Sequence, residues 1–368
     1  MSQEQHEWNM IDFEKMSKNF DFDGTFVSAE HFGCGHINST FLLTFKKDDG
    51  TLCRYVLQSI NQNVFKNING LMDNIISTQE YLKRKVEEEG GNIACECLRF
   101  IKSKKPNGTG MGAEYLFENF RAYHFVEGTE TYQKAESVET FADAGRAFGT
   151  FVRRLCGFPA ETLFETIPDF HNTKKRFGHF LEAVKNGVPE RVKAATPEIT
   201  FVKAREKYAN RVVELLSTGE LPHRVAHNDT KLNNVLFDSA TQKAVCVIDL
   251  DTIMQGSLLY DFGDAVRSGC STALEDEPDL SKVNFDKELY DAFSKSFIEA
   301  LGDNVVPKER ELLPFAAILM TYECGMRFLA DYLVGDVYFK TTYPEHNLVR
   351  ARTQFKLVSD MEKIFGIK

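Results

Sequence analysis

The sequence of 368 residues has no long uncharged apolar run. The best candidate, Leu312 to Met320, contains Pro314 and is less than half as long as a membrane-spanning helix. The segment from Met1 to Met10 is polar and acidic, without the basic and apolar regions of a signal peptide. These absences predict a cytoplasmic protein that has no membrane among its partners.

A surplus of basic residues is also missing, since the formal net charge is −10 at pH 7. Such a charge repels nucleic-acid backbones and anionic lipids at long range, so we expect no nucleic-acid partner. Apolar residues at 43% and charged residues at 27% are ordinary for a globular chain. Because a single hydrophobic core usually stops growing before about 300 residues, the length favours two domains.

The eight cysteines show no pattern typical of a metal site. Several stand in apolar runs, where a reduced thiol behaves as a small hydrophobic group. Cys95 and Cys97 form the only close pair in the sequence, and neither a second pair nor histidines follow at zinc spacing. The sequence therefore favours reduced cysteines over a zinc site.

The first third of the chain reads as short strands with one helix. The turn Lys46 to Gly50 lies between two strands, and a helix is expected over Asn69 to Glu89, ending at Gly90. Runs rich in β-branched and aromatic residues predict the strands, at 26–35, 41–45, 54–60, 98–102 and 121–126. We expect a small antiparallel sheet with one inserted helix.

Beyond Gly128 the periodicity becomes helical. The exception is the stretch from Arg224 to Asp251, where short apolar runs alternate with turns. Helices are predicted at 138–156, 174–185, 200–216, 286–301, 308–334 and 346–365. The fold class is therefore α+β, with an N-terminal lobe over 1–127 and a mainly helical C-terminal lobe over 128–368.

One motif carries most of the chemistry. His227, Asp229 and Asn234 have the spacing H-x-D-x4-N, and a hairpin and a strand ending at Asp249 follow, which is the arrangement that kinases use. Asp229 can accept the proton of an attacking hydroxyl, whereas Asn234 and Asp249, with Asp251 as a further oxygen ligand, suit Mg²⁺. The alternative is a polar turn followed by a strand-end cap, but the joint spacing favours catalysis.

The sequence also contains Asp-Phe-Gly at 261–263, the motif whose aspartate binds magnesium in protein kinases, which makes Asp261 an alternative metal ligand. The magnesium aspartate should close the strand that pairs with the catalytic-loop strand, and Asp249 is placed to do so. We therefore predict that Asp261 starts a helix or supports the catalytic loop through hydrogen bonds.

Two segments of the N-terminal lobe could bind a nucleotide. Gly33 and Gly35 let backbone N–H groups approach phosphates, and Asn38 could add a side-chain donor to phosphate or sugar. A third glycine is lacking, so a plain hairpin turn remains an alternative. His124, Phe125 and Val126 stand where a hinge would pair with adenine, although a buried strand end explains them equally well.

The third strand lacks the lysine that kinases direct at the α- and β-phosphates. Its counterpart is Gln58, a neutral amide that can bond phosphate without neutralising it. The metal or a basic residue elsewhere must then supply that charge, and the sequence does not identify this residue.

The segments His227–Asn234 and Ile248–Asp251 resemble those of the aminoglycoside phosphotransferase and choline kinase superfamily. With Ser271–Glu277 and Glu323–Leu333 added, the chain resembles bacterial N-acetylhexosamine 1-kinases over nearly its whole length. The resemblance implies a bilobal protein-kinase-like fold, with a nucleotide-binding lobe at 1–127 and a catalytic and sugar-binding lobe at 128–368.

The resemblance also implies that Asp229 is the base, that Asn234 and Asp249 bind the metal, and that Arg327 and Tyr338 line the sugar site. An ion pair between Arg327 and Asp331 on one helix face is the alternative for the first of these sugar-site residues. Ordinary packing is the alternative for Tyr338. The predicted substrate-binding residues are thus Asn38, Asp229, Arg327 and Tyr338.

The function predicted from the sequence is transfer of the ATP γ-phosphoryl group, with Mg²⁺, to the anomeric hydroxyl of an N-acetylhexosamine. A kinase acting on another small alcohol, such as choline, homoserine or an aminoglycoside, is the alternative within the same fold. A catalytically inactive nucleotide-binding protein is the alternative of another class, which retention of base and metal ligands disfavours. We expect a monomer or a weak homo-oligomer.

Overall fold

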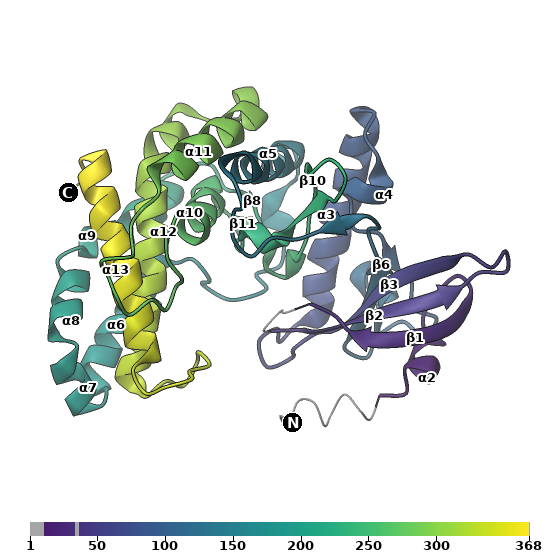
Figure 1. Ribbon diagram of the computed structural model, residues 1–368, viewed down its shortest axis with the longest axis horizontal. Coiled ribbons are helices and arrows are strands. Elements are labelled where there is room, and N and C mark those ends of the chain that lie inside the picture. The colour runs from purple at the N-terminus through teal and green to yellow at the C-terminus, as the bar shows by residue number, and fades with distance from the viewer. Residues whose placement is uncertain (1–10, 34–36, 368) are drawn as a thin grey trace. The chain divides into compact units, whose positions relative to one another are not determined.

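The computed structural model describes residues 11–33 and 37–367. The chain divides into two compact units, coloured along the sequence in Figure 1. Unit 1 comprises Met1–Thr129, Thr162–Ile167 and Leu250–Met254, and unit 2 comprises Glu130–Glu161, Pro168–Asp249 and Gln255–Lys368. Unit 1 thus includes two short segments from beyond the predicted boundary at 127/128.

Unit 1 is built on an antiparallel sheet. Its strands lie in the order β1-β2-β3-β6-β4, and β5 pairs with β6. The strands are β1 (Thr25–His31), β2 (Ser39–Lys46), β3 (Leu52–Ser59), β4 (Phe100–Ile101), β5 (Leu116–Phe117) and β6 (Phe120–His124). The turn between β2 and β3 contains Gly50 at φ 86°, the left-handed conformation for which glycine was expected there.

The two faces of this sheet differ in chemistry. Phe41, Leu43 and Phe45 alternate along β2 and belong to one buried cluster with Leu57 of β3 and Ala122 of β6. Residues adjacent in sequence to these point to the opposite face, so Thr40, Gln58 and Arg121 lie side by side across β2, β3 and β6. One face is therefore an aromatic core and the other carries a row of polar side chains.

The helix α3 (Ile68–Glu88) is the main helix of unit 1. The Asn67 side chain caps its first turn by accepting a hydrogen bond from Gly70 N–H. Gly90 follows its C-terminus at φ 72°, in agreement with the expected stop. The smaller elements are α2 (Phe13–Ser17), α4 (Ile93–Glu96), the 3₁₀ turn η1 (Gly112–Tyr115) and η4 (Leu250–Thr252).

Unit 2 is mainly helical (Figure 1). Its helices are α5 (Val138–Leu155), α6 (Thr173–Asn186), α7 (Pro189–Ala194), α8 (Thr196–Lys203), α9 (Glu206–Ser217), α10 (Leu258–Gly269), α11 (Lys287–Leu301), α12 (Pro307–Val334) and α13 (His346–Phe365). The single helix predicted over 200–216 is in fact two, α8 and α9. The prediction missed the break because Ala204 and Arg205, which lie at it, are not residues typical of turns.

Helix packing builds the core of unit 2. α5 packs against α11, and α12 packs against both α10 and α13. A Cβ at Gly145 or Gly149 of α5 would lie 2.6 or 2.5 Å from the backbone oxygen of Phe293 or Phe297 of α11. These glycines therefore allow close approach of the two helices.

Among the described residues, one helix, α12, is long and apolar enough to span a membrane. Its mean hydropathy is 1.3 over its most apolar window. However, 83% of that window is buried inside the structure. Burial on all sides is what the central helix of a globular core shows.

Short strands carry the motif segment of unit 2. β8 (Arg224–Ala226) leads into the segment 227–234, and the 3₁₀ turn η3 (Leu232–Asn234) closes it. β9 (Val235–Asp238) and β10 (Ala244–Val247) then form an antiparallel hairpin. Two further strands, β7 (Thr129–Glu130) and β11 (Met254–Gly256), lie where the chain passes between units. The predicted α+β, protein-kinase-like fold with an antiparallel N-terminal sheet and a helical C-terminal part is confirmed.

Candidate active site

The catalytic loop, defined as His227 to Asn234, lies between β8 and β9 in unit 2. The Asn234 amide donates from Nδ2 to the Asp229 carbonyl at 2.7 Å and to Asp229 Oδ2 at 3.2 Å. This orientation leaves Asn234 Oδ1, an acceptor, as the atom for a cation. The Lys231 ammonium lies 3.0 Å from Asp229 Oδ1. Although burial opposes its charge, the carboxylates of Asp229 and Asp264 raise the pKa of Lys231.

A backbone hydrogen bond links the residue before Asp249 to the end of the catalytic loop. Ile248 N–H donates to the Asn234 carbonyl at 2.9 Å, so the end of β10 is tied to the end of the catalytic loop. Asp249 itself has φ 60°, a left-handed conformation that Asp and Asn tolerate better than most residues. An amide oxygen and a carboxylate fit Mg²⁺, which usually takes one or two protein carboxylates and fills its other positions with phosphate and water oxygens.

His227 connects Asp229 to Ile248, the residue before Asp249. Its Nε2 lies 2.8 Å from the Ile248 carbonyl, and its Nδ1 accepts from Asp229 N–H at 3.3 Å. A carbonyl can only accept, so Nε2 carries the proton and Nδ1 is free to accept. The ring is fully buried and makes T-shaped contacts with the rings of Phe148 and Phe151 of α5. His227 therefore positions the loop and is not exposed to substrate.

Asp261 supports the catalytic loop from α10, as the sequence predicted. Its carboxylate accepts from His227 N–H at 2.9 Å and from Asn228 N–H at 2.7 Å, and its carbonyl accepts from Thr230 Oγ1. Burial raises the pKa of Asp261, against the opposing influence of the two N–H donors and His227. The carboxylate bonds two backbone N–H groups of the loop, and the carbonyl bonds a loop hydroxyl, so Asp261 supports the conformation of the loop.

A second histidine reaches the loop from the other side. His171 Nε2 lies 3.1 Å from the Asn228 carbonyl, and its Nδ1 lies 2.8 Å from Glu323 Oε1 of α12. The other Glu323 oxygen accepts from Thr173 Oγ1 at 2.9 Å. Burial opposes a charged ring, but Glu323 and the Asn228 carbonyl raise the pKa of His171. Both ring nitrogens face acceptors, so the geometry requires an imidazolium.

His171→Gln is expected to destabilise the protein by about 3 to 5 kcal/mol near pH 6, because a buried carboxylate loses its partner. The pKa of His171 is raised on folding, so this stabilisation is complete below the unfolded value of about 6.5 and is lost as pH rises through the folded value. Urea unfolding of wild type and variant between pH 6 and pH 9 measures it. The exposed His223, changed to Gln, is the control. A difference that stays constant with pH contradicts the charged pair.

Arg327 and Tyr338, the predicted sugar-site residues, lie on α12 and in the loop after it. The Arg327 guanidinium is 5.8 Å from the Phe170 ring centroid and 5.5 Å from that of Phe339. Asp331 does not pair with Arg327 within the described chain. Its carboxylate instead accepts from the N–H groups of the loop that follows, including that of Tyr338 at 2.8 Å. The helix-surface ion pair is therefore not the role of Arg327.

A second arginine lies beside the first. Arg176 of α6 donates from Nε and Nη2 to the Phe170 carbonyl, at 3.2 and 3.0 Å. Burial, followed by repulsion from the Arg327 guanidinium, lowers the pKa of Arg176. Glu323 stands one turn before Arg327 on α12 and reaches the catalytic loop through His171. The two guanidinium groups thus lie near Glu323, which is linked to the catalytic loop through His171, and the exposed Tyr338 side chain is a further neighbour of Arg176.

The predicted nucleotide-binding residues lie in unit 1. Gly33 has φ 78°, a left-handed conformation that glycine adopts without strain, whereas Gly35 lies outside the described residues. His124 ends β6, and burial lowers its pKa to about 4. Phe125 packs its ring beneath the Arg54 guanidinium at 4.2 Å, and Val126 is buried. Adenine pairing at 124–126 stays a prediction.

Asn38, Gln58 and Asp251 meet in one polar network of unit 1, in which Asp251 is buried and the other two are half-buried. Asn38 Nδ2 donates to Asp251 Oδ2, and Asn38 Oδ1 accepts from Asn61 N–H at 3.0 Å. Asp251 Oδ1 lies 2.5 Å from Arg121 Nη1. Arg121 also donates to Gln58 Oε1 from Nε at 3.0 Å and from Nη2 at 2.9 Å. Metal binding by Asp251 stays a prediction, although both of its oxygens already have protein partners.

Sequence reasoning missed four residues of this arrangement, namely Lys231, His171, Arg176 and Arg121. Lys231 stands inside the motif, so its spacing from Asp229 was a usable signal. Arg121 could have been found from strand register alone, since it pairs directly with Gln58. The other two lie more than fifty residues from the loop they serve and carry no local signal.

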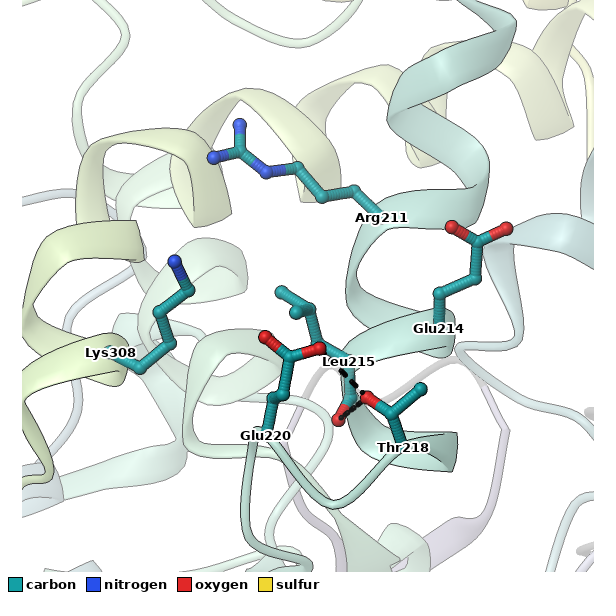
Figure 2. Close-up of a pocket in the computed structure, with 6 residues that line it drawn as sticks. All are labelled: Arg211, Glu214, Leu215, Thr218, Glu220 and Lys308. Atoms are coloured by element: carbon teal, nitrogen blue, oxygen red, sulfur yellow. Dashed lines mark hydrogen bonds between the residues drawn. The ribbon is translucent and has the colours of Figure 1, made fainter.

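A shallow pocket of about 290 Å³ lies at the end of α9, where the side chains of Figure 2 surround it. It is lined by Arg211, Glu214, Leu215, Thr218, Glu220 and Lys308. Several of these have partners already: Thr218 donates to Glu220, and Lys308 pairs with Glu311. None of the lining residues belongs to the candidate active site.

Residues 96–294, a little over half of the chain, match the phosphotransferase enzyme family known as APH. The chain belongs to this family. The matched stretch contains Arg121, the catalytic loop, Asp249 and Asp261, so the geometry described above is that of a phosphotransferase. The resemblance drawn from the sequence is thereby confirmed at the level of this family.

Solved structures of the same fold cover nearly the whole chain. Choline kinase from Cryptosporidium parvum Iowa II is 15% identical over 96% of this chain and 95% of that one, with a TM-score of 0.58. Aminoglycoside phosphotransferase from Alicyclobacillus acidocaldarius is 13% identical over 95% of each chain, with a TM-score of 0.56. The GDP complex of an aminoglycoside 2′-phosphotransferase-IIIa variant is 12% identical over 98% of each, with a TM-score of 0.53. At these identities the likeness concerns the fold.

Proposed function

We propose that this phosphotransferase uses ATP and Mg²⁺ to phosphorylate the anomeric hydroxyl of N-acetylglucosamine or N-acetylgalactosamine, giving the sugar 1-phosphate and ADP. The observation that carries the choice of acceptor is the pair of arginines, Arg176 and Arg327, which lie near Glu323 and so are linked to the catalytic loop of unit 2 through His171. Guanidinium groups repel a cation but donate hydrogen bonds to hydroxyl and acetamide oxygens. Choline and protonated aminoglycosides are cations.

The Glu323 carboxylate, which lies near both arginines, would not attract a cationic substrate. Glu323 is 1% exposed, and its two oxygens already bond His171 and Thr173. The His171 imidazolium offsets its charge, so that the carboxylate is not available to a cationic substrate. Nucleotide use is supported by the family and by the GDP complex of a structural neighbour.

The proposed reaction is a direct in-line transfer. Asp229 orients the anomeric hydroxyl and takes its proton as the sugar oxygen bonds the γ-phosphorus and the bond from that phosphorus to the bridging oxygen of ADP breaks. Mg²⁺, held by Asn234 and Asp249, would neutralise charge on the phosphates. The Lys231 ammonium, with 43% of its side chain exposed, lies next to Asp229 and can pair with the transferred group.

A product assay tests the proposal. The protein is incubated with Mg-ATP and one of N-acetylglucosamine, N-acetylgalactosamine, glucose, mannose or choline, and phosphorus NMR locates the new phosphate. We expect sugar 1-phosphates from the N-acetylated sugars, and slower turnover of glucose and mannose, because buried donors are left unpaired without the acetamide. Phosphocholine as the main product would overturn the proposed acceptor and retain the phosphotransferase.

Arg327→Ala is expected to raise the KM for the sugar and to lower kcat/KM by about tenfold to a hundredfold, because a charged hydrogen-bond donor is lost. The Kd for ATP should be unchanged, because the nucleotide-binding residues are predicted in unit 1. Steady-state kinetics with N-acetylglucosamine, N-acetylgalactosamine and glucose measure the effect. Arg352→Ala is the matched control, because it removes an arginine of α13 that pairs with Glu198 of α8. Unchanged sugar kinetics for Arg327→Ala would remove this residue from the site.

A further inference from the structure

The third strand of unit 1 has no cationic side chain at Gln58, but its neighbour in the polar row, Arg121 of β6, is a cation. Thr40, Gln58 and Arg121 are direct cross-strand partners on β2, β3 and β6. The Arg121 side chain is 3% exposed, and its Nη1 also lies 3.8 Å from the Met72 sulfur of α3. A buried guanidinium requires compensation, and two groups provide it, Gln58 and Asp251.

Arg121 determines which way the Gln58 amide faces. Both Nε and Nη2 donate to Gln58 Oε1, so the oxygen must face the arginine and the NH₂ group must face away from it. That NH₂ group donates to Thr40 Oγ1 at 3.1 Å, and it has a second hydrogen. Thr40 is the second residue of β2, two positions after Asn38 of the segment that also contains Gly33. The donor end of Gln58 therefore points toward the predicted phosphate-binding segment.

We propose that Arg121 is a positioning residue that supplies, through Gln58, the function of a third-strand lysine. Its charge polarises the Gln58 amide and holds the NH₂ group as a donor for the α- and β-phosphates of the nucleotide. The inference rests on the proposed use of ATP. Arg121 itself stays buried beneath Gln58 and does not touch the phosphates.

Asp251 completes the arrangement as the counter-ion of Arg121. One of its oxygens faces Arg121 Nη1 and the other accepts from Asn38, and its side chain is 5% exposed. The segment 250–254 is bound to the same unit a second time, since Asn74 Nδ2 of α3 donates to the Ile253 carbonyl at 2.8 Å. This assigns to Asp251 the task of fixing Arg121 and removes it from the metal ligands.

Gln58→Glu tests the proposal while keeping size and shape. The new carboxylate can still accept from Arg121, so the fold should be retained, but the donor is replaced by a negative charge. We expect the Kd for ADP, measured calorimetrically in EDTA, to rise about tenfold or more, whereas the Kd for adenosine stays within about twofold. Gln242→Glu, in the exposed β9–β10 turn, adds the same charge and should change neither constant.

Two further variants separate positioning from stability. Arg121→Lys keeps the charge but cannot bond Gln58 and Asp251 at once, so ADP affinity should fall by a smaller factor, about threefold. Asp251→Asn should lower the melting temperature and the ADP affinity in EDTA, and leave the affinity of the ADP complex for Mn²⁺, read by electron paramagnetic resonance, within about twofold of wild type. Loss of Mn²⁺ binding with unchanged ADP affinity would instead make Asp251 a metal ligand.

The outcomes distinguish this inference from the proposed function. Wild-type protein that binds ADP, with Gln58→Glu binding it equally well, overturns the role of Arg121 and leaves the kinase intact. Equal weakening of ADP and adenosine also overturns it, because the effect would then not concern phosphate. Wild-type protein that binds neither ADP nor adenosine overturns both.

Discussion

Asp229→Asn is expected to lower kcat by about two to four orders of magnitude, the range for loss of a positioned general base. The fold should survive, because an amide oxygen at this position can still accept from Asn234 Nδ2, and the backbone carbonyl that bonds the same amide is unchanged. The KM for the sugar and the Kd for ATP should change little. Single-turnover kinetics with N-acetylglucosamine, together with ATP titration, measure these quantities.

The hairpin that follows the loop offers a matched control. Asp238 accepts from Ala240 N–H and Thr241 N–H in the turn between β9 and β10. An asparagine there can accept the same bonds, so Asp238→Asn should leave kcat unchanged. Wild-type turnover in Asp229→Asn would mean that another group accepts the proton.

Asp249→Asn is expected to abolish measurable transfer at millimolar magnesium, because the site loses the carboxylate that would hold the metal on the phosphates. The substitution is well suited to the backbone, since asparagine adopts the left-handed conformation found at this position as readily as aspartate. The melting temperature without metal should therefore stay near that of wild type. Rates are measured over a magnesium titration, with thermal unfolding in EDTA alongside.

Asp261→Asn should behave in the opposite way. One of its carboxylate oxygens becomes an NH₂ group facing the N–H of His227 or Asn228, which costs about 1 to 3 kcal/mol of stability. The magnesium concentration for half-maximal rate should not move. If Asp261→Asn raises that concentration and Asp249→Asn does not, the metal assignment is reversed.

The catalytic loop could be predicted because its chemistry is local. His227, Asp229, Asn234 and Asp249 lie within one loop and one hairpin, so their spacing alone constrains the arrangement. Most of the longer strands and helices followed from periodicity, but the helix predicted over 200–216 is two helices, and α7 and α10 were not among the predicted helices. The supporting role of Asp261 is observed, and the choice of Asp249 as the metal ligand stays a prediction that rests on the hairpin at 235–247.

Other parts of the site could not be predicted, because their residues meet only in three dimensions. His171 and Glu323 are 152 positions apart and bond each other at 2.8 Å. Arg121 meets Asp251 across 130 positions, counted from their residue numbers. No periodicity links such pairs, since hydrophobic patterns report which face of an element is buried and not what lies against it.

Unit 1 is built from three separate stretches of the chain, and this limits which recombinations between related genes can preserve it. Recombination between relatives at 127/128 would exchange Arg121 but keep the recipient's Asp251. A hybrid in which the incoming chain carried lysine on its third strand, and no arginine on β6, would bury an aspartate without a cation. Arg121, Gln58 and Asp251 should therefore change together during divergence or not at all.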